Sequence, residues 1–110
     1  MDINKETENQ IQELQMLEQS IQALLMQKQS FQLELSETEN ALLEAGKIKE
    51  DIYKIVGNIM IKSPAPMIIK ELKEKKDLIS MRLKSIENQE KVLTEKSENL
   101  REKVISKIKS

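Results

Sequence analysis

Residues Asp51–Lys62, which read DIYKIVGNIMIK, decide how the rest of the chain is interpreted. Isoleucine, valine and tyrosine dominate this stretch, and β-branched and aromatic side chains are enriched in β-strands. Gly57-Asn58 divides it, and a two-residue loop that begins with glycine suits the type II′ turn of a β-hairpin. We therefore predict a hairpin over residues 52–62, with strands at about Ile52–Val56 and Ile59–Lys62.

Strong helix breakers occur in one window of the chain only. They are Gly46, Gly57, Pro64 and Pro66. The residues outside this window form two arms, 4–46 and 66–109, each about 65 Å long if helical at about 1.5 Å per residue. Helices of this length predict a coiled coil. Two starts remain open for the second helix, one with Ser63 before Pro64 and one with Ala65 before Pro66.

Apolar residues follow a heptad spacing in both arms, which is the pattern of a coiled-coil seam. The seam of the first arm is Leu14, Leu17, Ile21, Leu24, Lys28, Phe31, Leu35, Thr38, Leu42 and Ala45. The seam of the second arm is Ile69, Leu72, Lys76, Ile79, Leu83, Ile86, Glu90, Leu93, Ser97, Leu100 and Val104. The second seam contains more polar positions and is therefore the weaker of the two.

The two seams come into register if the arms fold back on each other antiparallel. The layers then include Leu42 with Leu72, Phe31 with Leu83, Leu14 with Leu100 and Thr7 with Lys107. The weak layers include Lys28 with Ile86, Leu24 with Glu90 and Leu17 with Ser97. We therefore expect a mainly α fold, a long antiparallel coiled-coil helical hairpin with a β-hairpin between the helices, and a single domain over residues 1–110.

Charge is divided unevenly along the chain. Residues 1–45 carry 9 acidic and 2 basic side chains, whereas residues 46–110 carry 10 acidic and 16 basic ones, and the net charge is only −1. Halves of opposite sign favour a chain that folds back on itself or meets a complementary partner. A net charge near zero provides no field for nucleic acid or a membrane surface, so we expect neither as a partner.

The composition argues against an enzyme. The chain has no His, Cys or Trp, which removes imidazole and thiol nucleophiles and the usual zinc ligands. Glu37 and Glu39 lie on different faces of a helix, and no glycine-rich phosphate loop is present. We expect no catalytic residue, metal or cofactor. No signal peptide and no apolar run of spanning length is evident, so we expect a cytoplasmic protein.

The predicted hairpin indicates assembly with other chains. An isolated two-stranded hairpin is marginal in water, and this chain has no third strand to pair with it. We expect its strands to pair between subunits, through Ile52, Tyr53, Ile55, Val56, Gly57, Ile59, Met60 and Ile61. The alternative is an apolar plug at the turn of a helical hairpin, without any sheet.

The motif Tyr53-Lys54-x-Val56-Gly57, followed by an apolar strand and by Lys70–Lys75 (KELKEK) on the second helix, resembles the β-class subunit of prefoldin. Gln27-Lys28-Gln29 in the first arm belongs to the same resemblance. It implies a hexamer of two α-class and four β-class subunits, in which the hairpins of all chains build intersubunit β-barrels. It also implies an ATP-independent holdase that captures unfolded client proteins between its coiled-coil tips and passes them to a group II chaperonin.

Apolar residues near the free ends of the arms are the candidate client-binding surface, because the predicted seam loosens there. They are Ile3, Ile11, Leu14, Val104, Ile105 and Ile108. The plainer interpretation is that these are scattered exposed apolar residues of an ordinary surface. A structural coiled-coil scaffold or adaptor is the alternative function, and it would keep its seam tight to both ends.

Overall fold

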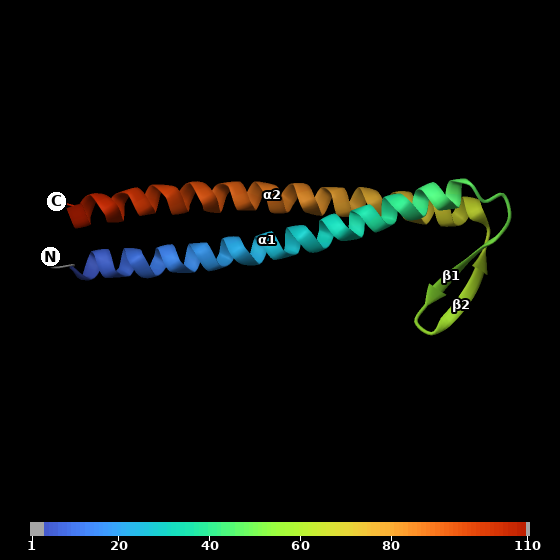
Figure 1. Cartoon of the computed structure of the whole chain (residues 1–110), viewed down its shortest axis with the longest axis horizontal. Helices are drawn as coiled ribbons and strands as arrows, with labels where there is room; N and C mark the ends of the chain where they lie inside the picture. The colour runs from blue at the N-terminus through green and yellow to red at the C-terminus, as the bar shows by residue number, and fades with distance from the viewer. Residues whose placement is uncertain (1–3, 110) are drawn as a thin grey trace. The chain divides into compact units, whose positions relative to one another are not determined.

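A computed structural model describes residues 4–109, which form two long helices with an antiparallel β-hairpin between them (Figure 1). The elements are α1 (Lys5–Gly46), β1 (Ile52–Val56), β2 (Ile59–Ser63) and α2 (Ala65–Lys109). The predicted mainly α fold, with a β-hairpin between two long helices, is confirmed. The described residues divide into two compact units, one made of residues 4–29 with 84–109 and the other of residues 30–83.

Helix α1 begins at a side-chain cap. Oδ1 of Asn4 accepts a hydrogen bond from the backbone N–H of Thr7 at 2.8 Å, and the Asn4 carbonyl accepts one from Glu8 at 3.0 Å. Asparagine is a preferred residue at this position because its side chain satisfies an otherwise unpaired N–H of the first turn. Glu6 and Glu8 add negative charge at the positive end of the helix dipole.

Helix α2 begins at Ala65, and its cap is a residue that the sequence did not single out. The carbonyl of Pro64 accepts hydrogen bonds from the N–H groups of Met67 and Ile68 at 3.1 and 3.2 Å. Ser63 does not cap the helix, because it is the last residue of β2 and pairs with Ile52. Pro66 lies in the first turn, where its missing N–H leaves no helix bond unmade.

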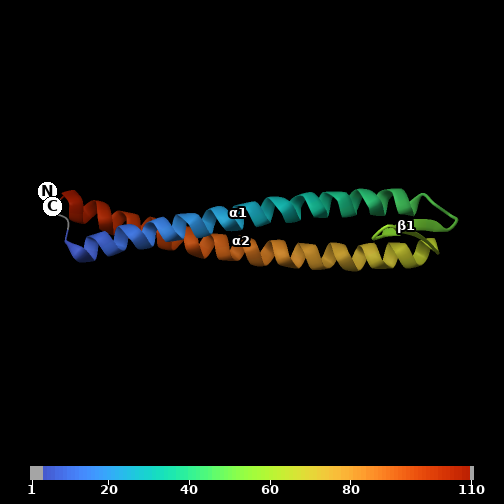
Figure 2. The ribbon, with the colours of Figure 1, turned by 90° about the horizontal axis from the view of Figure 1, so that it is seen from below.

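In the first unit, the segments of α1 and α2 run antiparallel and side by side (Figure 2). Glu6 pairs with Lys107 at 3.2 Å and Glu18 pairs with Arg101 at 2.7 Å, so residue numbers rise on one helix as they fall on the other. Lys107 also donates a hydrogen bond to Gln10. It therefore lies beside Thr7, as the predicted register requires.

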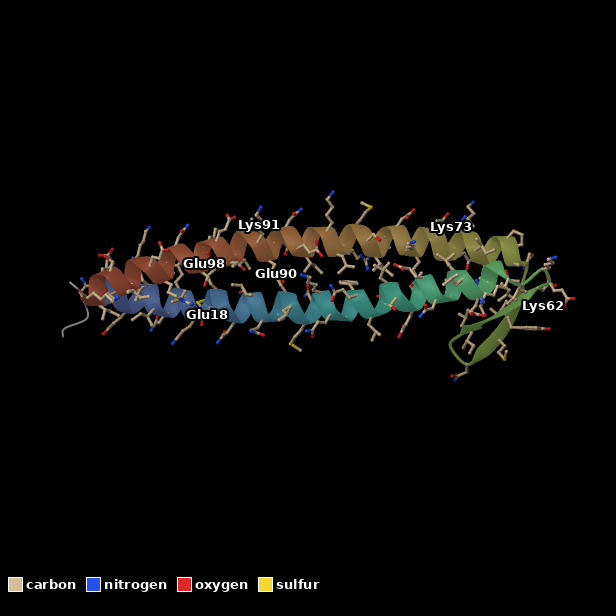
Figure 3. The ribbon with its side chains drawn as sticks, turned by 45° about the horizontal axis from the view of Figure 1, so that its top comes forward. Glu18, Lys62, Lys73, Glu90, Lys91 and Glu98 are labelled. Atoms are coloured by element: carbon tan, nitrogen blue, oxygen red, sulfur yellow. The ribbon has the colours of Figure 1, made fainter. Side chains whose placement is uncertain are left out.

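Side chains of the first unit alternate between the seam and solvent as the heptads predict. Every predicted seam position in residues 14–28 and 86–104 is buried or half-buried. Figure 3 shows Glu90 between the two helices, whereas the next residue, Lys91, points away from α1. Lys91 is exposed and Glu90 is half-buried, which is the pattern of a helix with a single buried stripe.

The second unit contains the hairpin and the helix segments next to it. Glu34 pairs with Lys75 at 3.6 Å, and the Arg82 guanidinium lies 5.9 Å from the centroid of the Phe31 ring. The most buried large side chain of this unit is Ile79, which is only 2% exposed. All predicted seam positions of this unit are buried or half-buried, and the hydroxyl of buried Thr38 donates to the Glu34 carbonyl at 2.8 Å.

Candidate functional site

The hairpin of the second unit is the first candidate site, and its turn is built by one glycine. Val56 pairs with Ile59, so Gly57 and Asn58 form a two-residue loop. Gly57 has φ +62°, and no other described residue has a positive φ. This pattern fits the predicted type II′ turn and excludes type I′, which needs a positive φ at both loop residues. The alternative of an apolar plug without a sheet is wrong.

The register gives the hairpin two different faces. Residues that lie opposite each other in the ladder share a face, so Tyr53 with Lys62 and Ile55 with Met60 form one side, which we call the open face. The pair Lys62 and Asp51 adds an ion pair of 3.4 Å at its edge. The positions of Lys62 and the hairpin are visible in Figure 3.

The opposite face of the hairpin is tied to the start of α2. The Lys54 ammonium donates to both carboxylate oxygens of Glu71, at 3.3 and 3.2 Å, and the Ser63 hydroxyl donates to the Met67 sulfur at 3.6 Å. Lys54 and Ile52 are half-buried and Ser63 is buried. These contacts orient the hairpin within the second unit and leave the open face in solvent.

Apolar side chains are exposed over most of the hairpin. Ile55 is 73% exposed, and Tyr53, Met60 and Ile59 are each 59 to 65% exposed. Val56 and Ile61 are exposed as well, and in the described part of the chain each strand has a single partner strand. Exposed apolar residues beside unpaired strand edges are typical of a surface that another chain covers. The predicted assembly residues thus lie together, and Ile52 alone among the side chains is half-buried.

Sequence reasoning missed exposed apolar residues close to the hairpin in the chain. Leu43 and Ile48 precede it and Met67 follows it, and all three are exposed. Leu43 and Met67 lie outside the predicted heptad seams, which is the signal that would have found them.

The second candidate site is at the free ends of the helices, in the first unit. Ile3 lies outside the described residues. Val104 is buried, Ile11, Leu14 and Ile108 are half-buried, and Ile105 is exposed. These side chains share one end of the unit, but the seam there is closed by Val104 and by the contacts of Lys107 with Glu6 and Gln10. They become available together only when this end of the seam opens.

The described residues contain no cluster of three or more acidic side chains that is arranged to hold a metal ion. Within residues 4–109, neither helix has a segment apolar enough to span a membrane.

Comparisons with known proteins identify the family to which this chain is similar. A family model described as "Prefoldin subunit" matches residues 8–110. A protein named prefoldin subunit beta from Thermococcus gammatolerans is 39% identical over 71 residues, covering 63% of this chain and 61% of that protein. One of the same name from Archaeoglobus fulgidus is 34% identical over 101 residues, covering 90% and 87%.

A solved structure is similar over nearly its whole length. The crystal structure of the prefoldin beta subunit from Thermococcus strain KS-1 matches with a TM-score of 0.91 and 32% identity, covering 99% of this chain and 97% of that one. Among the curated relatives, the matches to the Thermococcus gammatolerans protein and to one from Saccharolobus islandicus span about three fifths of those chains.

Proposed function

This chain belongs to the prefoldin family as an archaeal-type β-class subunit, and from that premise we propose that it is an ATP-independent holdase subunit of a hexameric chaperone. Prefoldins are non-enzymatic chaperones. In the proposed complex, four copies of this chain assemble with two α-class subunits, capture unfolded proteins at their coiled-coil tips and transfer them to a group II chaperonin in the cytoplasm. Residues 1–110 act as one functional domain.

The observation that carries the proposal is the exposed apolar hairpin. Tyr53, Ile55 and Met60 project from one face of a sheet that has only two strands within residues 4–109. Strand pairing with other subunits would satisfy the free N–H and C=O groups and remove these side chains from water. The added backbone hydrogen bonds and the burial of apolar side chains both favour a multi-chain β-structure over a monomer.

The proposed client surface is at the free ends of the helices. Ile11, Ile105 and Ile108, with the half-buried Leu14 and the buried Val104, form an apolar group that opening of the terminal seam would expose. A seam that opens and closes suits a holdase, because it can bind many unfolded sequences without recognising one.

Native mass spectrometry of this chain with an α-class subunit tests the assembly. We expect one complex of two partner chains and four copies of this chain, and that complex should suppress aggregation of an unfolded protein without ATP. A stable dimer that ignores the α-class chain would contradict the proposal and favour the scaffold alternative. Hydrogen exchange separates these functions further, because a scaffold should protect its terminal turns as strongly as its middle.

A further inference from the structure

An ion pair joins the hairpin to α2. The Lys54 ammonium donates to both carboxylate oxygens of Glu71, at 3.3 and 3.2 Å. Among the ion pairs of residues 4–109, this one alone connects a strand with a helix. Lys54 belongs to the motif at residues 53–57 and Glu71 to the stretch at residues 70–75, so the two stretches that carry the family resemblance meet at this contact. Neither the turn nor the open face uses this pair, so its role is separate from theirs.

The pair is the outermost polar contact between the hairpin and α2 in the described part of the chain. Ser63, Ile61 and Ile59 lie on the same face of β2, because alternate residues of a strand share a face. Ser63 is 6% exposed, Ile61 is 41% exposed and Ile59 is 65% exposed, so burial falls from the base of the hairpin toward its turn. Lys54 lies opposite Ile61 in the ladder. The support that α2 gives the hairpin therefore ends at about this rung.

The hairpin is attached to α2 through one residue. β2 ends at Ser63, α2 begins at Ala65, and the ring of Pro64 between them fixes its φ. The Ser63 hydroxyl contacts the Met67 sulfur at 3.6 Å, close to this attachment. Figure 1 shows the hairpin leaving the start of α2 at an angle. The ion pair lies two rungs farther from the attachment, and a contact on a longer lever restricts that angle more tightly.

The pair is too exposed to contribute much to the stability of the chain. The Lys54 and Glu71 side chains are 36% and 49% exposed, and exposed ion pairs add little to the free energy of unfolding. Such a contact can still select one hairpin orientation among several of similar energy, because a few-fold change in population is enough for that.

We propose that Lys54 and Glu71 are positioning residues for assembly, which hold the hairpin at the angle where its strands meet those of neighbouring subunits. This inference rests on the proposed hexameric assembly and names two residues that control it. Subunits form a closed complex only when each interface meets the next at a fixed angle, and other angles give open or mixed assemblies. Loss of the pair should therefore reduce the fraction of chains that are ready to assemble, without unfolding them.

Assembly measurements test the positioning role. Lys54→Met keeps the aliphatic stem and Glu71→Gln keeps the side-chain shape, and each removes the ion pair. We expect the competent fraction of the unassembled chain to fall about threefold, which raises the concentration of half assembly with the α-class subunit by about two- to threefold. Lys54→Glu with Glu71→Lys rebuilds the pair with reversed charges and should restore the wild-type value. Sedimentation velocity over a dilution series measures these concentrations.

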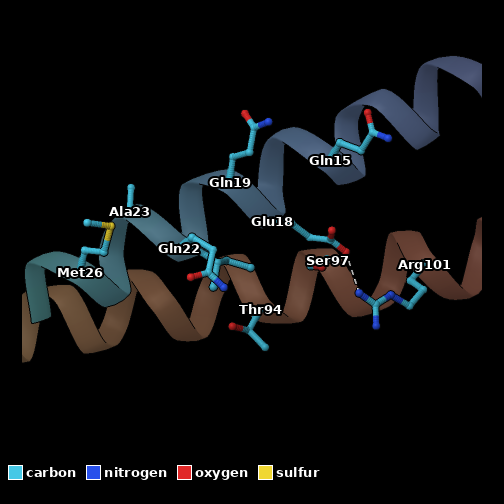
Figure 4. A pocket seen from close by; sticks show the side chains of 10 residues that line it. Gln15, Glu18, Gln19, Gln22, Ala23, Met26, Thr94, Ser97 and Arg101 are labelled. Atoms are coloured by element: carbon cyan, nitrogen blue, oxygen red, sulfur yellow. Dashed lines mark hydrogen bonds and ion pairs between the residues drawn. The ribbon is translucent and has the colours of Figure 1, made fainter. Parts of the chain in front are cut away.

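The matched control is an ion pair of the first unit. Glu18 lies 2.7 Å from Arg101, and Figure 4 shows the two side chains pointing toward each other. Glu18 is 48% exposed and Glu71 is 49% exposed, so Glu18→Gln removes an equally exposed charge that does not contact the hairpin. This variant should assemble as the wild type does.

Spin labels measure the hairpin angle directly. The chain has no cysteine, so Asn58→Cys and Lys73→Cys provide two exposed thiols, one at the turn and one on α2. Pulsed electron–electron double resonance on the unassembled chain should give one narrow distance distribution. The distribution should broaden when Lys54→Met is added and narrow again with the reversed pair.

Four results would overturn the proposal. They are a distance distribution that is the same with Lys54→Met as without it, single variants that assemble at wild-type concentrations, a reversed pair that restores neither measurement, and a loss of equal size with Glu18→Gln. The same samples test the assembly itself. Wild-type chain that forms no complex with the α-class subunit would reject the proposed function and this inference with it, whereas a normal wild-type complex matched by both single variants would reject only the positioning role.

Discussion

The Lys28 ammonium lies 3.5 Å from Oε1 of Glu90, so two polar residues that interrupt the seams of α1 and α2 pair with each other. Both side chains are about one quarter exposed, and the second carboxylate oxygen of Glu90 is buried without a hydrogen-bond partner in the described part of the protein. The ammonium is therefore the charge that makes this carboxylate tolerable in the seam.

Removing only the Lys28 charge should destabilise the protein. Lys28→Met keeps the aliphatic stem and leaves the Glu90 carboxylate unpaired, which we expect to lower the free energy of unfolding by about 1–3 kcal/mol. Urea unfolding at fixed protein concentration, followed by far-ultraviolet circular dichroism, measures the change.

The control for this prediction removes both charges. Lys28→Met with Glu90→Leu replaces the pair by apolar side chains, and we expect stability equal to or above that of the wild type. A double variant less stable than Lys28→Met alone would contradict this account, because it would show that Glu90 is tolerated in the seam without the ammonium.

The pairing of Lys28 with Glu90 is a feature that the sequence did not predict. Every seam position that the heptads predicted is buried or half-buried, because burial of one stripe follows directly from helix periodicity. The heptads placed Lys28 opposite Ile86 and Leu24 opposite Glu90, in separate weak layers. Long side chains reach across adjacent layers, so the partner of a seam lysine depends on rotamers that the heptad pattern does not contain.

Two other features differ in how well the sequence predicted them, and the reasons are local. The hairpin turn was predictable because only glycine readily adopts the positive φ that the loop needs. The start of α2 was not, because Ser63 is a good cap in isolation but is already used by the ladder with Ile52.

Replacing Gly57 should weaken the hairpin without a steric clash. A Cβ at this position would meet no atom within 4 Å, so the penalty of Gly57→Ala comes from the positive φ alone. We expect a loss of about 1–2 kcal/mol, together with a smaller assembled fraction in native mass spectrometry.

Gly46 provides a matched control for this substitution. A Cβ there would also meet no atom within 4 Å, but the φ of Gly46 is not positive, and it is the last residue of α1. Gly46→Ala should leave assembly unchanged and should be neutral or slightly stabilising. Equal effects at the two glycines would contradict the turn as the cause.

Polar substitution on the open face of the hairpin should prevent assembly. Ile55→Ser removes an apolar side chain that is 73% exposed, so the isolated chain should lose little stability while the multi-chain complex fails to form. Met81→Ser is the control, because Met81 is 70% exposed on α2 and should tolerate the change. Sedimentation velocity with the α-class subunit measures both, and a complex of normal size with Ile55→Ser would argue against pairing through this face.

Polar substitution at the helix ends should separate client binding from assembly. The four changes Ile3→Ser, Ile11→Ser, Ile105→Ser and Ile108→Ser remove apolar surface from the proposed tips, and we expect loss of protection of an aggregating protein by a complex of normal mass. Leu33→Ser, Leu78→Ser and Met81→Ser form the control, since these exposed residues lie in the other unit. Because Ile11 and Ile108 are half-buried, hydrogen exchange on the same samples is needed to compare opening of the terminal turns. Full protection by the tip variant, with its terminal turns opening as in the wild type, would place the client surface elsewhere on the complex.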